Sequence, residues 1–169
     1  SNQQLEDELL VTPSAQLAEV ALAKGDFERG KQLFYKSAAA CSSCHDPGAN
    51  KVRIGPDLTK LTTVLSPEEL VDSVLRPSKR IDPNYANVNV ITVDGKQFNG
   101  LRVMEDDKKL VLRNLATPDP IEIMQEDIEV ITDSRTSLMP ANLARTLKDR
   151  QEFDDLIKYV LEVRLAKEK

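Results

Sequence analysis

The run Cys41-Ser42-Ser43-Cys44-His45 constrains this chain more than any other feature. It contains both cysteines and the only histidine among the 169 residues. Two thiols three residues apart can form thioethers with the two vinyl groups of a porphyrin, and the residue after them is then held beneath the iron. Imidazole is a good axial ligand for that iron. The pattern is the attachment signature of c-type haem, so we predict one covalent haem c on Cys41 and Cys44, with His45 as an iron ligand.

Other interpretations of the two cysteines need features that the sequence lacks. A structural zinc site normally takes four Cys or His ligands, and this chain has three. A disulfide across two residues would constrain little of the unfolded chain. A thioredoxin-like thiol oxidoreductase expects a βαβ context, whereas helix and loop are predicted around this motif. The thiol oxidoreductase remains an alternative.

Composition excludes several classes of partner. The net charge is −5, and no basic run is interleaved with aromatic residues, so no nucleic-acid partner is expected. No apolar stretch approaches the length of a membrane span. Covalent haem attachment generally takes place outside the bacterial cytoplasm. We therefore expect a periplasmic or otherwise extracytoplasmic location, with the sequence representing a mature chain or an excised domain.

Helical patterns occupy both ends of the chain. Residues 1–11 are interpreted as a polar lead-in, and a helix is predicted over 13–24, ending at Gly25. A second helix opens at Asp26 and leads into the cysteine motif, after which residues 46–65 are expected to form loops. The remaining two predicted helices begin at a capping box over Ser66–Glu69 and after Thr146, with Asp149 three residues beyond Thr146 as part of the cap.

A change to two-residue periodicity predicts strands in the middle of the chain. The turn Asp94-Gly95 is a strong hairpin signal. The five expected strands form an antiparallel β meander, at residues 87–93, 96–104, 109–113, 121–124 and 128–132. The chain then turns irregular at 134–141. Three roles for the meander remain open: shielding one haem edge, docking a partner domain, or dimerisation through an edge strand.

The sixth iron ligand is expected to be a methionine. A second histidine does not exist in the chain, and a thioether is the remaining good ligand. Met104 and Met124 fall in predicted strands, where methionine usually fills a core. Met139 falls in the irregular segment Ser137-Leu138-Met139-Pro140, which proline stiffens. Met139 is therefore the preferred ligand, and an open sixth site is the alternative.

The segment after the cysteine motif carries a family resemblance. Gly55-Pro56-Asp57-Leu58 resembles the turn of class I cytochromes c, in which the proline carbonyl accepts the N–H of the ligand histidine. Pro56 is the matching residue here. Gly30, Phe34 and Tyr159 resemble the crossing of that family's first and last helices. The resemblance implies a mainly α fold with a helical core. We therefore expect residues 26–169 to form the cytochrome domain. The meander at 87–132 is then a β insertion, which a typical class I cytochrome lacks, and residues 1–25 are an extension with one helix.

Further motifs narrow this resemblance to the haem-binding cytochrome domain of planctomycete and verrucomicrobial type. They stand in order along the chain: Arg76-Pro77-Ser78-Lys79-Arg80-Ile81, Tyr85, Val93-Asp94-Gly95 and Ser137-Leu138-Met139-Pro140. Such domains often follow propeller-like dehydrogenase regions or helical repeats. The resemblance implies that Ile81 and Tyr85 line the haem pocket, and simple core packing is an equal alternative. Arg53, Lys79 and Arg80 can pair with haem propionates, although a solvated surface charge is the preferred interpretation of each.

Together these residues predict a monohaem electron carrier rather than an enzyme. With both axial positions filled, no site remains for a substrate, and the iron cycles between Fe(II) and Fe(III). The expected partner is a redox protein or a fused dehydrogenase domain, and the sequence leaves the oligomeric state open. The alternative function is a haem c domain with an open or labile sixth site that acts as a peroxidase or gas sensor.

Overall fold

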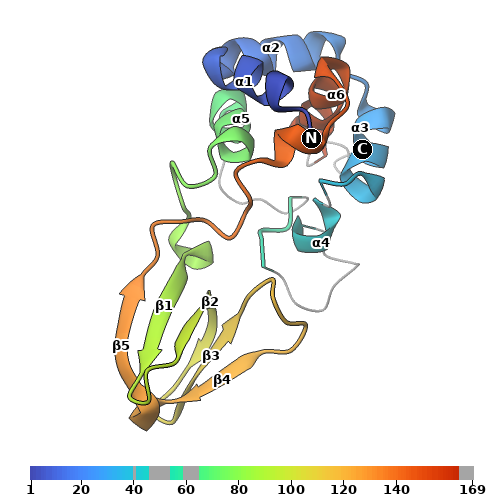
Figure 1. The fold of residues 1–169 in the computed structure, drawn as a ribbon. Helices are drawn as coiled ribbons and strands as arrows, with labels where there is room; N and C mark the ends of the chain where they lie inside the picture. Colours follow the sequence, from blue (N-terminus) through green and yellow to red (C-terminus); the bar gives the residue numbers. More distant parts are fainter. Residues whose placement is uncertain (40, 46–53, 59–64, 164–169) are drawn as a thin grey trace. The chain divides into compact units, whose positions relative to one another are not determined.

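The computed structural model describes residues 1–39, 41–45, 54–58 and 65–163. These residues divide into two compact units (Figure 1). The helical unit consists of Ser1–Lys79 and Pro140–Lys169, and the β unit consists of Arg80–Met139. Six α-helices and a five-stranded antiparallel sheet make up the described part of the chain. The expectation of a mainly α chain is therefore only partly confirmed, because a whole compact unit is built on strands.

The helices of the helical unit follow the predicted pattern closely after residue 12. The α-helices are α1 (Gln3–Val11), α2 (Ser14–Lys24), α3 (Phe27–Lys36), α4 (Ser42–His45), α5 (Pro67–Leu75) and α6 (Arg150–Glu162), and a 3-10 turn, η3, covers Leu143–Thr146. Asp26 caps α3 by accepting the Arg29 N–H, and Ser66 and Glu69 form the predicted capping box of α5. The cap of α6 is Asp149 alone, because Thr146 ends the preceding 3-10 turn.

Residues 1–11 are helical, so the prediction of a polar lead-in is wrong. Asn2 caps α1 by accepting the Leu5 N–H at 3.1 Å. Leu5 and Leu9, one helical turn apart, are buried in the same core as residues of α2, α5 and α6. Glu6 is buried as well, and its carboxylate pairs with the Arg145 guanidinium. The N-terminal segment therefore carries two helices where one was expected, and both help to enclose the core.

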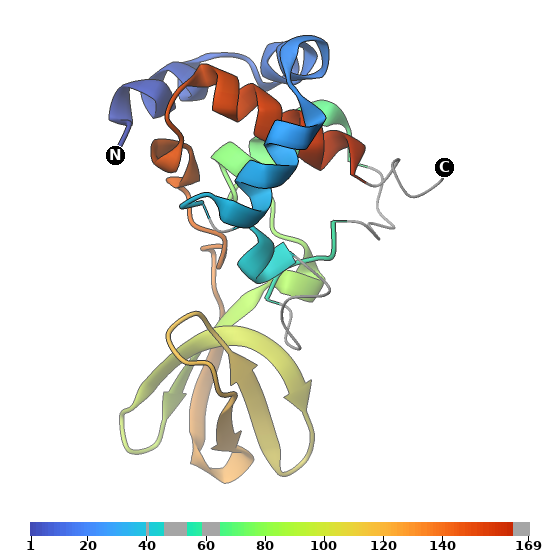
Figure 2. The ribbon, with the colours of Figure 1, turned by 90° about the vertical axis from the view of Figure 1, so that its right-hand side faces the viewer.

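Helices α3 and α6 cross at Gly30, as the resemblance implied (Figure 2). A Cβ atom at Gly30 would overlap the Asp155 carbonyl and lie 2.8 Å from Cβ of Tyr159. The Tyr159 ring packs against Phe27 and Phe34, with centroid separations of 5.1 and 5.2 Å. Tilted aromatic pairs at this separation are favourable. The small glycine thus lets the two helix backbones meet, and the aromatic rings flank that contact.

Asp155 fixes the same crossing by hydrogen bonding. Its buried carboxylate accepts from Arg29 Nε at 2.7 Å, from the Asp26 backbone N–H at 2.7 Å and from Gln151 Nε2 at 2.9 Å. Burial alone would raise the pKa of Asp155, but the hydrogen bonds from Arg29, Gln151 and Asp26 outweigh it and hold the pKa below its usual value. The start of α3 is therefore clamped to α6 through one carboxylate.

The β unit contains the five predicted strands within one residue of their expected ends. They are β1 (Asn87–Thr92), β2 (Gln97–Glu105), β3 (Lys109–Arg113), β4 (Ile121–Met124) and β5 (Ile128–Asp133), with 3-10 turns η1 (Pro83–Tyr85) and η2 (Gln125–Asp127). The hairpin turn at Asp94-Gly95 is present, and Gly95 adopts φ +80°. That positive φ is a backbone conformation that glycine adopts without a steric penalty.

The strand order corrects the prediction of a simple meander. The order is β4-β3-β2-β1-β5, so β5 pairs with β1 instead of β4. The consecutive strands β4 and β5 thus lie at opposite edges, which in a flat sheet would be about 19 Å apart at about 4.8 Å per strand. The link through η2 spans about 14 Å at most. The sheet must therefore curl, and Figure 2 shows β2 curving across the unit.

The curled sheet encloses a small apolar core of its own. Its buried members are Val88, Val90, Leu110, Leu112 and Ile123. Gly100 lies against β3, where a Cβ atom would be 2.6 Å from the Arg113 carbonyl oxygen. The two strand methionines lie outside this core, since Met104 is 42% exposed and Met124 is 45% exposed. The interpretation of these methionines as core filler is therefore wrong.

Candidate functional site

The cysteine motif is wound into a single helical turn. The Cys41 carbonyl accepts hydrogen bonds from the Cys44 N–H at 3.2 Å and from the His45 N–H at 3.0 Å. Residues three apart on a helix lie on the same face, so this turn places the two cysteines side by side and His45 next to them. Both cysteines are free and partly exposed. The helical turn thus brings the two thiols and the imidazole close together.

The imidazole of His45 is oriented by the backbone of Pro56. Its Nδ1 lies 2.8 Å from the Pro56 carbonyl oxygen. A carbonyl can only accept, so Nδ1 carries the hydrogen and the neutral ring keeps its lone pair on Nε2. Burial lowers the pKa of His45, and the Pro56 hydrogen bond opposes that shift only in part. The ring is therefore held in the tautomer that leaves Nε2 available to a metal ion.

Gly55 lies against the same ring. A Cβ atom at this position would lie 2.7 Å from Cε1 and 2.9 Å from Nδ1 of His45. The Gly55 N–H also donates to the Cys44 carbonyl at 3.3 Å, which ties this turn to α4. The glycine thus forms a cradle for the imidazole that any larger residue would fill. No role for Gly55 was predicted from the sequence, although its position beside Pro56 was the available signal.

The two thiols share an environment that disfavours the thiolate. Burial raises the pKa of Cys41 to about 11, and burial also raises the pKa of Cys44. A CxxC oxidoreductase depends on a thiolate with a lowered pKa. The shifts at Cys41 and Cys44 are in the opposite direction, so the electrostatics of this site differ from those of a disulfide exchange centre.

The residues present fit a covalent haem. Cys41 packs at the margin of the helical core together with Phe27, Leu33, Leu58 and Val74, each of which keeps part of its surface exposed. Such partly covered apolar side chains suit a flat apolar group. Two thiols on one face, an imidazole with a free Nε2 and the Gly55 cradle complete the set.

The other predicted site residues belong to the β unit. Tyr85 ends η1, two residues before β1, and Ile81 lies just upstream of that turn. Met139 closes the segment that follows β5. Because β1 and β5 are antiparallel neighbours, with Val88 paired to Asp133, both segments emerge at the same end of the sheet. The fold thus groups Cys41, Cys44, His45 and Pro56 in one unit, and Ile81, Tyr85 and Met139 at one end of the other.

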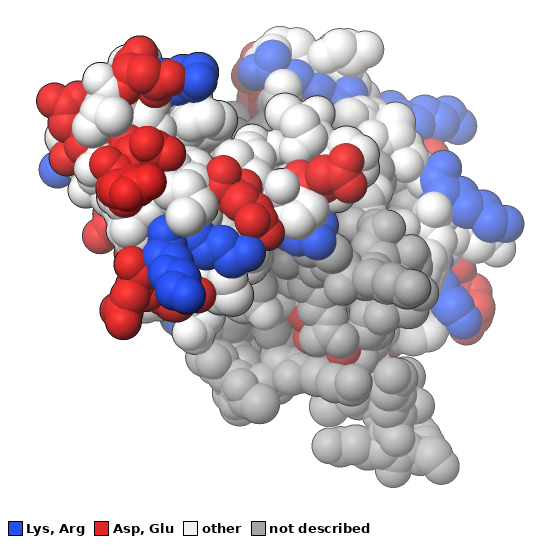
Figure 3. All heavy atoms as spheres, turned by 90° about the horizontal axis from the view of Figure 1, so that it is seen from below, with Lys and Arg blue, Asp and Glu red and all other residues white. Residues whose placement is uncertain are grey.

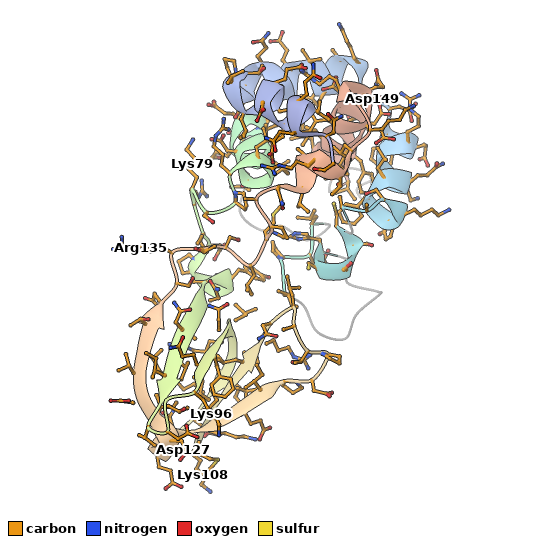
Figure 4. All side chains as sticks on the ribbon, in the orientation of Figure 1. Lys79, Lys96, Lys108, Asp127, Arg135 and Asp149 are labelled. Carbon is orange, nitrogen blue, oxygen red and sulfur yellow. The ribbon has the colours of Figure 1, made fainter. Side chains whose placement is uncertain are left out.

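The competing methionines lie near the opposite end of the β unit. Met124 is paired with Lys109, and Met104 is one residue from the end of β2. Both positions are close to the turn that contains Lys108. Figure 4 shows Lys108, Lys96 and Asp127 together at one end of this unit and Arg135 at the other. Met139, four residues after Arg135, is therefore separated from both alternatives by the length of the sheet.

Three basic residues, Arg53, Lys79 and Arg80, were candidates for pairing with the haem propionates. The Lys79 ammonium contacts the Asp72 carboxylate at 2.5 Å and remains 61% exposed, which agrees with the preferred interpretation of a surface charge. Arg80 is exposed, and Arg53 lies outside the described residues, as does most of the loop expected at 46–65. Figure 3 shows acidic and basic side chains interspersed over the described part of one face.

Within residues 1–39, 41–45, 54–58 and 65–163, no group of three or more His, Cys, Asp or Glu side chains is arranged to hold a metal ion. In the same part of the chain, no helix combines the length and the apolar character that crossing a membrane requires.

A family model matches part of this chain. Residues 27–98 match the family model described as Cytochrome c. No curated protein matches the chain. The matched segment begins at the first residue of α3 and includes the cysteine motif, the Gly55-Pro56 turn and α5. This match supports a c-type cytochrome with a general role in haem-binding electron transfer, and it implies covalently attached haem c with its iron.

Proposed function

We propose that this chain is a monohaem c-type cytochrome domain that carries single electrons, with His45 and Met139 as the axial ligands of the iron. When bound, haem c supplies an iron centre that alternates between Fe(II) and Fe(III). Cys41 and Cys44 anchor the porphyrin covalently. The observation that carries the proposal is the 2.8 Å contact between His45 Nδ1 and the Pro56 carbonyl, which aims Nε2 away from the backbone.

The protein residues then set how easily the iron gives up its electron. The Pro56 hydrogen bond increases the basicity of the imidazole, and a methionine thioether raises the potential relative to a second imidazole. Ile81 and Tyr85 are proposed to line the haem pocket. With both axial positions filled, the domain passes electrons on and performs no chemistry on a substrate.

The cellular role follows from the same chemistry. We place the domain outside the cytoplasm, between a dehydrogenase domain or partner that donates electrons and a second carrier that accepts them. The proposed donor rests on the resemblance to multidomain secreted proteins. It is tested by measuring reduction of the haem-loaded protein by a dehydrogenase encoded in the same reading frame or beside it.

The first experiment measures haem attachment. Protein produced together with the maturation machinery should give one haem c per chain in a pyridine haemochrome assay. Replacement of both Cys41 and Cys44 by alanine should abolish covalent attachment. A wild-type chain that acquires no covalent haem would instead favour the thiol oxidoreductase.

The second experiment measures axial ligation. The ferric protein should show the far-red methionine–iron charge-transfer band, and Met139→Ala should abolish the band and lower the potential. Met104→Ala and Met124→Ala are matched controls, because both side chains are exposed on the sheet, and they should leave the spectrum unchanged. A wild-type protein that lacks the band, or that readily binds peroxide or a diatomic gas, would favour the open sixth site of a peroxidase or sensor.

A further inference from the structure

The segment that ends at Met139 is held to the sheet by its own hydrogen bonds. The Ser134 N–H donates to the Asn87 carbonyl at 2.9 Å, which joins the end of β5 to the start of β1. The Ser134 hydroxyl is 3.2 Å from both the N–H and the carbonyl oxygen of Thr136. The Ser137 hydroxyl accepts the Met139 N–H at 3.1 Å. The segment is therefore a sequence of short serine turns anchored on a paired strand.

The anchor itself lies in a buried part of the β unit. Asn87 is 3% exposed, and its side-chain amide donates to Asn99 on β2 at 3.1 Å. A residue bonded to both neighbouring strands has little freedom to move. The segment that leads to Met139 is thus bonded to the sheet at Asn87 through Ser134, and Ser137 bonds to Met139 itself.

The backbone of Met139 is restrained from both directions. On its N-terminal side, the Ser137 hydroxyl holds its N–H, an arrangement in which serine fixes the backbone two residues later. On its C-terminal side, Pro140 sterically disfavours the α region for the residue before it. Two independent restraints therefore limit the backbone conformations of Met139, and with them the directions in which its side chain can leave the chain.

We propose that Ser137 is the positioning residue for the axial methionine, and that the β unit serves as the rigid support of that ligand. This inference rests on the proposed role of Met139 and assigns a purpose to the β insertion that the sequence left open. Ser137 acts through Met139 and makes no contact with the iron. Loss of its hydroxyl releases the Met139 N–H, so the thioether samples more orientations and competes less well against other ligands.

The test compares Ser137→Ala with two matched variants in haem-loaded protein. The measured quantities are the intensity of the far-red methionine–iron band, the midpoint potential and the affinity of added imidazole for the ferric iron. Losing the hydrogen bond to the Met139 N–H should tighten apparent imidazole binding about three- to tenfold, weaken the band and lower the potential. Ser137→Thr keeps a hydroxyl at the same position and should restore all three values. Thr136→Ala alters the neighbouring side chain, while its backbone groups still bond to Ser134, and should resemble wild type.

The outcomes separate this inference from the proposed function. If wild type shows the band and Met139→Ala removes it, but Ser137→Ala matches wild type, then Ser137 does not position the ligand. Equal effects of Ser137→Ala and Thr136→Ala would also overturn the assignment, because they indicate a general sensitivity of the segment. If wild type lacks the band altogether, the ligand assignment of Met139 fails first and the inference fails with it.

Discussion

The imidazole of His45 lies directly on the backbone of Gly55, where a Cβ atom would be 2.7 Å from the ring carbon Cε1. Real Cβ atoms do not approach other atoms this closely, so either the ring or the turn must move when the side chain is enlarged. The same ring is bonded to Pro56. Displacement of the ring therefore also affects the hydrogen bond that fixes its tautomer.

This contact predicts the behaviour of Gly55→Ala. Overpacking should cost about 1–3 kcal/mol of stability, and weakening of the Pro56 hydrogen bond should raise the midpoint potential, because the ligand becomes less basic. Guanidinium unfolding and a redox titration of the haem-loaded protein measure the two effects. Gly95→Asn is a suitable control, since asparagine tolerates positive φ and nothing lies within 4 Å of that position. An unchanged potential in Gly55→Ala would contradict the cradle.

The α3–α6 crossing predicts a large effect for Gly30→Ala. The new Cβ would collide with the Asp155 backbone, which cannot rotate away as a side chain can. We expect a loss of about 1–3 kcal/mol or more in the free energy of unfolding, measured by urea titration. Gln32→Ala, at an exposed position of the same helix, should change stability by less than about 0.5 kcal/mol. Similar values for the two variants would mean that the helices do not meet at Gly30.

Helix α1 predicts a difference between two adjacent leucines. Leu9 is fully buried, whereas Leu10 is 37% exposed. Leu9→Ala should cost about 2–5 kcal/mol through lost burial and the cavity that remains. Leu10→Ala should cost much less, because its side chain already contacts water. Thermal and chemical unfolding of both variants measure the difference, and equal costs would show that α1 lies outside the core.

The carboxylates of Asp154 and Asp155, which are neighbours on α6, should contribute to folding stability with opposite dependences on pH. The pKa of Asp155 is lowered in the folded protein, so its contribution is present above its unfolded pKa of about 3.9 and is lost as pH falls below that value. Burial raises the pKa of Asp154 despite its pairing with Arg150. Ionisation of Asp154 therefore destabilises the fold as the pH rises above its unfolded pKa of about 3.9.

The corresponding variants are Asp155→Asn and Asp154→Asn. At pH 7 the first should cost roughly 1–2 kcal/mol, because its half-exposed partner Arg29 is screened by solvent. The cost should shrink as the pH falls below about 4. The second should be neutral or stabilising at pH 7 and lose that advantage in acid. Unfolding titrations from pH 3 to 7 give both profiles, and parallel profiles would refute the assignment of the two shifts.

Local sequence signals predicted helices α2, α3, α5 and α6 and all five strands. Capping residues such as Asp26 and Ser66 satisfy helix ends from within a few positions. The hairpin at Asp94-Gly95 is likewise set by a two-residue preference. The helix crossing at Gly30 was available only through the family resemblance, since its partners Asp155 and Tyr159 are more than a hundred positions away.

The features that sequence did not predict depend on distant partners. Helix α1 looks polar because only Leu5 and Leu9 mark its inner face, and the buried Glu6 is neutralised by Arg145 at a distance of 139 positions. The pairing of β5 with β1 is fixed by closure of the sheet around its core, which local periodicity does not encode. Met104 and Met124 were assigned to a core because strand periodicity alone does not indicate which face of the sheet is covered.

The pairing of β1 with β5 also limits the conformational entropy that is lost when the two halves of the helical core come together. The chain enters the β unit through β1 and leaves through β5, and these strands are adjacent, with the Asn87 carbonyl bonded to the Ser134 N–H. The entrance and exit of the insertion are therefore about one strand spacing apart, roughly 5 Å. The entropic cost of closing a flexible loop grows with the number of residues in it. Once the sheet has formed, the paired residues from Asn87 to Ser134 therefore add little more to the connection between the two halves of the helical core than a short turn would.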